Sequence, residues 1–111
     1  MTGAWAAYTN DNNQWIEADL GEVKHIFSIT TQGRQAFDQW VTTFKLEMSC
    51  DGTNWNTMKN EDGFDRIYRG NHDRNTKVTQ TMPVGTKARF VRLLPQTWYD
   101  NISLRWDIFG C

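Results

Sequence analysis

The alternation of apolar and polar residues along short segments is the strongest constraint on how this chain folds. Between Trp15 and Leu20, the apolar side chains of Ile16, Ala18 and Leu20 share one face, and the acidic residues between them take the other. A period of two places successive side chains on opposite faces of an extended strand, so the segment is predicted to be a half-buried strand. No segment shows the longer apolar period of an amphipathic helix. The pattern therefore predicts an all-β protein.

Seven further segments show β-branched or alternating residues bounded by turn residues. Asp51-Gly52 and Asp62-Gly63 are hairpin signals between two pairs of them. Eight short strands at regular spacing are typical of an antiparallel β-sandwich or barrel. Three connections are longer and polar or aromatic, and such loops on a rigid scaffold commonly carry function. The seven segments are 26–31, 44–48, 55–58, 66–69, 76–82, 88–94 and 103–109, and the connections are 6–13, 33–39 and 96–101.

Composition favours a single binding domain over residues 1–111 rather than an enzyme. Hydrophobic residues make up 39% of the chain, enough for one core, and six of its residues are Trp. The net charge of −1, with acids and bases interspersed, gives no basic stripe for nucleic acid. His25 and His72 have no Cys or Ser motif to work with, and no phosphate-binding loop or metal-spaced Cys/His set is present. We expect no catalysis, no cofactor and no nucleic-acid partner.

Several segments, in order along the chain, carry the sequence motifs of one family. Residues 3–5 read G-A-W, 14–21 read Q-W-I-E-A-D-L-G, 40–45 read W-V-T-T-F-K, 49–55 contain S-x-D-G-x-x-W, 70–76 contain G-N-x-D-x-N-T, and 88–92 read A-R-F-V-R. The match runs from Gly3 to Cys111 without a large gap. In this arrangement the chain resembles a discoidin (coagulation factor V/VIII type C) domain.

This resemblance implies a discoidin-type jelly roll, a β-sandwich of about eight antiparallel strands. It also implies an extracellular module, secreted or part of a cell-surface ectodomain, that binds phospholipid, glycan, collagen or another protein through loops at one end. Family members carry a further N-terminal stretch, with one binding loop and a Cys that pairs with the terminal Cys. Relative to the family, the domain is expected to be N-terminally truncated. Cys111 then forms either a bridge to Cys50 or no intramolecular bridge.

The loop 33–39 corresponds to a ligand-contacting loop of the family. Phe37, at its centre, is expected either to insert into a membrane or cap a pocket, or to fold back on Trp40 or Trp98. Arg34 is expected either to clamp a ligand carboxylate or to form an ion pair with Asp38 or Asp11. Gln35 and Asp38 complete the candidates in this loop.

The two other long loops, 6–13 and 96–101, are expected at the same end. Strand 15–20 follows loop 6–13 and strand 26–31 leads into loop 33–39, so a hairpin of these two strands would place both loops together. Tyr99 is a candidate for stacking on a ligand, whereas Trp98 is expected to pack structurally. The acids and amides suit hydroxyl-rich or cationic ligands, with a Ca²⁺ site or simple turn caps as alternatives. The candidates from these loops are Tyr8, Asn10, Asp11, Tyr99 and Asp100.

Three hypotheses on function follow. The preferred one is a non-catalytic adhesion or recognition module that binds a protein or glycan through these loops. The second is a peripheral membrane module that docks on phospholipid through Phe37. The third is a structural fragment whose binding end has been lost.

Overall fold

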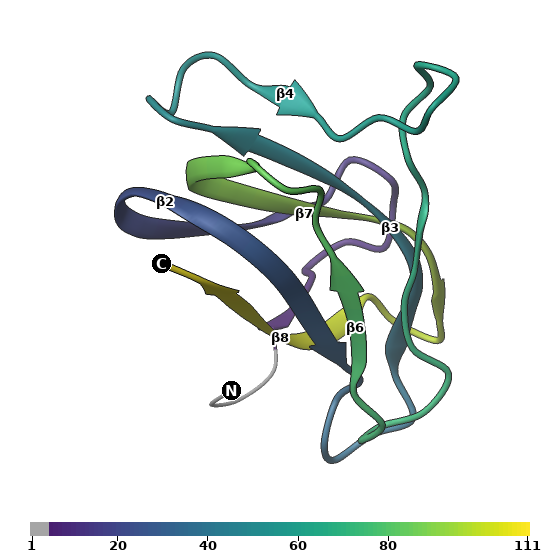
Figure 1. The fold of residues 1–111 in the computed structure, drawn as a ribbon. Helices are drawn as coiled ribbons and strands as arrows, with labels where there is room; N and C mark the ends of the chain where they lie inside the picture. The colour runs from purple at the N-terminus through teal and green to yellow at the C-terminus, as the bar shows by residue number, and fades with distance from the viewer. Residues whose placement is uncertain (1–4) are drawn as a thin grey trace.

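The structure is a computed structural model that describes residues 5–111, and these residues form eight antiparallel strands and no helix (Figure 1). The described residues accordingly contain no helix with the length and hydropathy needed to cross a bilayer. The strands are β1 (Trp5–Ala6), β2 (Ile16–Gln32), β3 (Trp40–Ser49), β4 (Asn56–Thr57), β5 (Tyr68–Arg69), β6 (Val78–Thr81), β7 (Lys87–Tyr99) and β8 (Ser103–Gly110). The prediction of an all-β sandwich of about eight strands is confirmed.

The long strand β2 belongs to both layers of the sandwich. Its first part pairs with β7, from Ile16 opposite Leu93 to His25 opposite Lys87, and its second part lies between β6 and β8. The register shifts between Asp19 and Lys24, and the strand bends there (Figure 1). Gly21 in this bend has φ 85°, a conformation that costs glycine little because it has no Cβ.

The bend in β2 explains how one chain segment builds two layers. The first layer contains the N-terminal part of β2 followed by β7, β3 and β4, with β5 also paired to β3. The second contains β6, the C-terminal part of β2, β8 and β1. The two segments 15–20 and 26–31, predicted as separate strands, are therefore one bent strand. The eighth strand is instead the short β1, which the sequence pattern missed.

The core lies between the layers and is built from the inward positions of the alternating strands. The side chains of Ile29, Leu46, Leu93 and Ile102 are completely buried, and Phe44 stacks on Tyr68 with ring centroids 5.5 Å apart. Such burial of apolar area is the main source of stability for a domain of this size. The core thus fixes the strand ends from which the loops leave.

Two side chains near the start of β2 make contacts that the strand register explains. Trp15 lies at the base of the first loop, where half of its surface is exposed and its ring contacts the guanidinium of Arg92. The register places Glu17 opposite Arg92, which bonds it at 2.8 Å, and Asp19 pairs with Arg89 at 2.9 Å.

The prediction of a long loop over residues 96–101 was wrong. The ladder between β3 and β7 continues to the pair Trp40 and Tyr99, so β7 extends through most of the expected loop. What remains is a tight turn at Asp100, whose φ of 64° lies in the left-handed region. The connection between β7 and β8 is therefore a short turn that presents Asp100 and Asn101.

Candidate functional site

Four connections meet at one end of the sandwich, and we call this region, residues 7–15, 33–39, 70–77 and 100–102, the loop end. The backbone N–H of Ala7 donates to Ile102 across the first and last connections at 2.9 Å. Arg105 reaches from β8 and donates to the carbonyl oxygens of Gly33 and Arg74 at 2.9 and 2.8 Å. Direct hydrogen bonds therefore hold the loops together, as expected for a preorganised binding surface.

Gln39 is a buried amide that links two of the predicted site residues. Its Oε1 accepts hydrogen bonds from Nη1 of Arg34 at 2.9 Å and from the buried Ser103 hydroxyl at 3.2 Å. Its Nε2 donates to the carboxylate of Asp100 at 3.4 Å. Sequence reasoning did not single out Gln39, because nothing in the local pattern distinguishes a buried amide from a solvated one. The amide thus links a cation in loop 33–39 to an anion in the turn 100–102.

Arg34 and Phe37 form a cation–π pair at the tip of the loop 33–39. The guanidinium carbon lies 4.2 Å from the centroid of the Phe37 ring, and half of the Phe37 surface stays exposed. Neither of the expected ion pairs of Arg34 forms, because Asp38 bonds Nε of Arg74 at 2.7 Å and Asp11 accepts from its own loop. Arg34 thus keeps guanidinium donors that no described residue uses.

Tyr99 lies at the end of β7, directly before Asp100. Its ring stacks on Trp40 with centroids 4.8 Å apart and planes 12° apart, and 54% of its surface is exposed. Trp98 is half-buried and packs against the core, in line with its predicted structural role. The Tyr99 ring is therefore held in a fixed orientation while it remains accessible to a ligand.

The first loop is joined to this cluster through Asn10. Its side chain donates to Oδ1 of Asn101 at 2.5 Å and accepts from the backbone N–H of Ile102 at 2.8 Å. Asp11 accepts hydrogen bonds from the Asn13 backbone and the Gln14 amide, which is the turn-capping role. Tyr8 is fully exposed.

The loop 70–77 is ordered by Asp73. Its carboxylate accepts from the Thr76 hydroxyl at 2.6 Å and from the Thr76 and Asn75 backbone, which lowers the pKa of that carboxyl below its usual range. The described residues contain no group of three or more His, Cys, Asp or Glu side chains arranged to hold a metal ion. The acids at the loop end are dispersed among amide, hydroxyl and guanidinium donors.

The structure thus brings five of the nine predicted residues into one cluster, which comprises Asn10, Arg34, Phe37, Tyr99 and Asp100. The other four lie at the loop end but outside the cluster. Asp38 turns toward Arg74, Asp11 caps its own loop, and Gln35 and Tyr8 are exposed.

Comparison with known proteins identifies this architecture. The sequence matches the family described as F5/8 type C domain over residues 1–108. The chain belongs to the F5/8 type C domain family.

Individual relatives agree with that assignment. Discoidin-2 from Dictyostelium discoideum is 41% identical over 107 residues, which cover 96% of this chain and 40% of the relative. Mouse retinoschisin is 36% identical over 109 residues, covering 97% of this chain and 49% of the relative. The native structure of recombinant discoidin II superposes with a TM-score of 0.87 at 40% identity, covering 96% of this chain and 41% of that one. The F5/8 type C domain described here spans less than half the length of these relatives.

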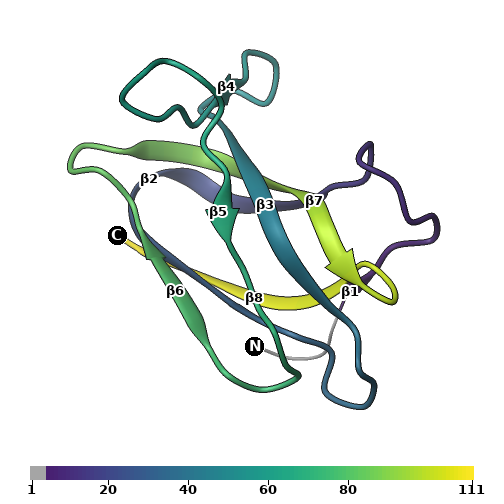
Figure 2. The same cartoon turned by 90° about the vertical axis from the view of Figure 1, so that its right-hand side faces the viewer.

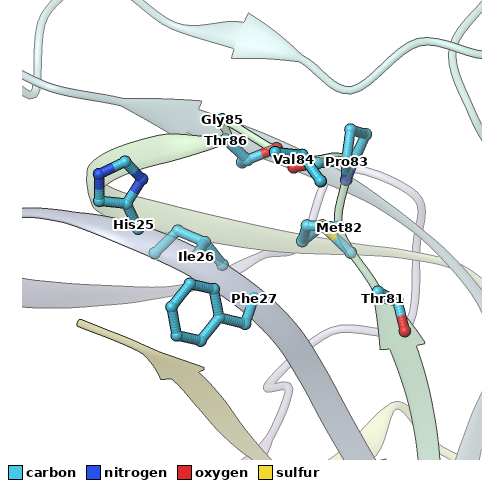
Figure 3. A pocket seen from close by; sticks show the side chains of 9 residues that line it. All are labelled: His25, Ile26, Phe27, Thr81, Met82, Pro83, Val84, Gly85 and Thr86. Atoms are coloured by element: carbon cyan, nitrogen blue, oxygen red, sulfur yellow. Dashed lines mark hydrogen bonds between the residues drawn. The ribbon is translucent and has the colours of Figure 1, made fainter.

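A separate apolar hollow of about 370 Å³ lies between β2 and the turn that joins β6 to β7 (Figure 3). Its floor includes the buried side chains of Ile26 and Met82, its rim includes the exposed Phe27 and Val84, and the His25 ring lies at one side. None of the nine predicted residues lines it. Although this hollow is roomy, it lacks the convergent polar groups of the loop end, so we place the candidate site at the loop end.

Proposed function

We propose that this F5/8 type C domain is an extracellular recognition module that binds a protein or glycan ligand at the loop end. The observation that carries the proposal is the cluster around Gln39, where a cation and an anion flank two half-exposed rings. Interface hot spots are enriched in Tyr and Arg held in fixed positions. The proposed contacts are Arg34, Phe37, Tyr99, Asp100 and Asn10, with Tyr8, Asp11, Gln35 and Asp38 around them.

The mixture of groups supports a hydroxyl-rich or polar ligand. Arg34 donates hydrogen bonds, Asp100 accepts them, and Asn10 does both, while Tyr99 offers a flat apolar face. Sugar rings and polar peptides present this combination of hydroxyl or amide groups with an apolar face. The proposal needs no Ca²⁺, because the contacts named are direct hydrogen bonds and ring stacking.

The alternative is docking on phospholipid, and the exposed Phe37 with Arg34 over its ring is the observation that favours it. Asp38 is neutralised by Arg74, but the two other acids at this end, Asp11 and Asp100, oppose approach to an anionic leaflet. We therefore rank glycan or protein recognition above membrane docking.

An array of glycans and extracellular-matrix proteins, run beside co-sedimentation with phosphatidylserine liposomes, separates the alternatives. The proposal predicts saturable binding on the array that is lost in Tyr99→Ala, with no dependence on phosphatidylserine. Binding that requires phosphatidylserine and disappears in Phe37→Asp would instead establish membrane docking. No binding in either assay would favour the structural fragment.

A further inference from the structure

We propose that the outer face of the first layer carries a second binding site, which takes a single neutral sugar unit. The site is a hollow of about 250 Å³ on the outer face of β7, β3 and β4, next to the first loop. It is distinct from the apolar hollow and from the cluster around Gln39. Its lining residues are Asn12, Lys45, Glu47, Thr57, Asp65, Leu94 and Gln96.

The strand register explains why these residues converge. Inward positions of β3 such as Leu46 and Met48 are buried, so Lys45 and Glu47 project outward. Glu47 lies opposite Thr57 of β4 on one side and Arg92 of β7 on the other, and Lys45 lies opposite Leu94. The hollow therefore has polar side chains from three strands around the apolar side chain of Leu94.

Several of these polar groups have no partner within the described part of the chain. No described residue donates a hydrogen bond to the Glu47 carboxylate, because Arg92 beside it bonds Glu17. The Thr57 hydroxyl and the Asn12 amide also have no partner among residues 5–111, and all three groups line the hollow. Glu47 and Thr57 are partly buried, and Asn12 is exposed at the edge of the hollow. Donors and acceptors that converge without bonding one another are the pattern of a polar ligand site.

The charges favour a neutral ligand over an ionic one. Lys45 is neutralised by Asp65, whose carboxylate lies 3.2 Å from its ammonium, and Asp65 also pairs with Lys59. An anion would meet Glu47 and Asp65, and a cation would meet Lys45. A vicinal diol can donate to a carboxylate and accept from an amide at the same time, which matches this lining.

The size of the hollow points to a ligand of one ring. Pockets for drug-sized ligands span roughly 300–1,000 Å³, so this smaller hollow suits a single sugar unit. Trp15 and Trp55 do not line it, and Arg92 lies over their rings at 4.9 and 3.8 Å. The ligand would therefore be held by the polar lining, with Leu94 as the apolar contact.

Amide and indole NMR of the whole chain, titrated with galactose, glucose, mannose and N-acetylgalactosamine, tests the site. We expect at least one of these sugars to shift the amides of Lys45, Glu47 and Gln96 saturably, with a Kd of about 1 mM. Glu47→Ala and Asn12→Ala should each weaken this response about tenfold. Asn56→Ala, an exposed neighbour of Thr57 outside the hollow, should leave it unchanged.

Three outcomes would overturn the site. The first is no saturable shift on the outer face with any of the sugars. The second is a shift that survives both Glu47→Ala and Asn12→Ala, or that acetate or ammonium ions reproduce. The third is a shift confined to residues 34–39 and 99–101, which would support the loop end alone. The reverse result, outer-face shifts that persist in Tyr99→Ala, would support the second site whatever the loop end binds.

Discussion

At the scale of single residues, the loop end depends on one buried amide more than on any exposed group. Gln39 forms one hydrogen bond each with Arg34, Asp100 and Ser103, and so holds the first two in place. The exposed candidates could be predicted from the sequence because loop aromatics and charged residues are conspicuous there. The amide could not, since its importance arises only when residues 34, 100 and 103 meet in space. Asp38 was expected to pair with Arg34 in its own loop, but it pairs with Arg74, which the fold brings close from another loop.

The two cysteines give a prediction at this scale. Cys50 lies beside Lys87, Lys87 pairs with His25, and His25 exchanges backbone hydrogen bonds with Cys111. Three ladder steps of about 4.8 Å separate the two cysteines, whereas a disulfide needs Cα atoms within about 7 Å. Both thiols are exposed and free in the structure. We expect two reactive thiols per chain when the unreduced protein is denatured and titrated.

The control for the thiol experiment is a non-reducing gel. Monomer with two titrated thiols agrees with the geometry. A monomer without reactive thiols would mean that Cys50 and Cys111 are bridged and that the strand order near His25 is wrong. A dimer that loses one thiol per chain would indicate pairing through one exposed cysteine between chains.

At the scale of elements, close packing of the loops makes Gly33 a sensitive position. A Cβ at Gly33 would lie 2.3 Å from the Asp73 carbonyl oxygen and 3.1 Å from Cβ of Trp40. Gly33→Ala must therefore push loop 70–77 away from the start of loop 33–39. Overpacking of this kind costs about 2 kcal/mol, which lowers Tm by roughly 10 °C in a small domain.

Calorimetry on Gly33→Ala and on Gln35→Ala checks this prediction. Gln35 is exposed in the same loop, so its replacement should leave Tm within about 2 °C of the unmodified chain. Equal Tm values for the two variants would show that the loops are not packed as described.

Acid sensitivity also belongs to the elements, because turn carboxylates hold their connections. Asp51 accepts from the backbone of Thr53 and Asn54 after β3, and these bonds keep its pKa well below the usual range. Hydrogen bonds likewise lower the pKa values of Asp19, Asp65 and Asp73. A carboxyl with a folded-state pKa below its unfolded value stabilises the fold above the unfolded pKa, and this contribution is lost as pH falls through the folded pKa.

We therefore expect Tm to stay flat from pH 7 to about 5 and to fall below about pH 4, where unfolded aspartates begin to bind protons. Asp51→Ala should lower Tm at pH 7 and make the loss toward low pH smaller. Circular dichroism melts across this pH range measure both effects. An unchanged acid slope in Asp51→Ala would rule out Asp51 as a main contributor.

At the scale of the whole molecule, the fold follows from the sequence more completely than the site does. Alternation and turn residues predicted the strands, because inward positions such as Leu46 and Leu93 must be apolar to build the core. The pattern could not show that β2 crosses between layers, since a bend with Gly21 looks the same as a break between two strands. It also could not show that β7 runs on to Tyr99, because the pairing with Trp40 is a tertiary contact.

The loops before and after β2 were correctly predicted to lie at one end, but the predicted cause, a hairpin of two separate strands, was not quite right. The expected hairpin is a single strand that bends back, and the two ends of β2 still reach the same region (Figure 2). The second site proposed on the outer face was not predicted, because its residues come from β3, β4, β7 and two loops. Such a site becomes visible only when the strand register is known.

The central claim is that the loop end of this F5/8 type C domain binds ligand through Arg34 and Tyr99, and paired binding and melting measurements test it most directly. On the same glycan and matrix-protein array, Arg34→Ala and Tyr99→Ala should each weaken binding about tenfold or more. Both variants should keep a Tm within about 5 °C of the unmodified chain, since Tyr99 is exposed and the partly buried Arg34 loses one hydrogen bond to Gln39. Glu61→Ala, exposed in the turn after β4, should change neither quantity. Full binding in both variants with an unchanged Tm would contradict the claim, as would a loss of binding that merely follows unfolding.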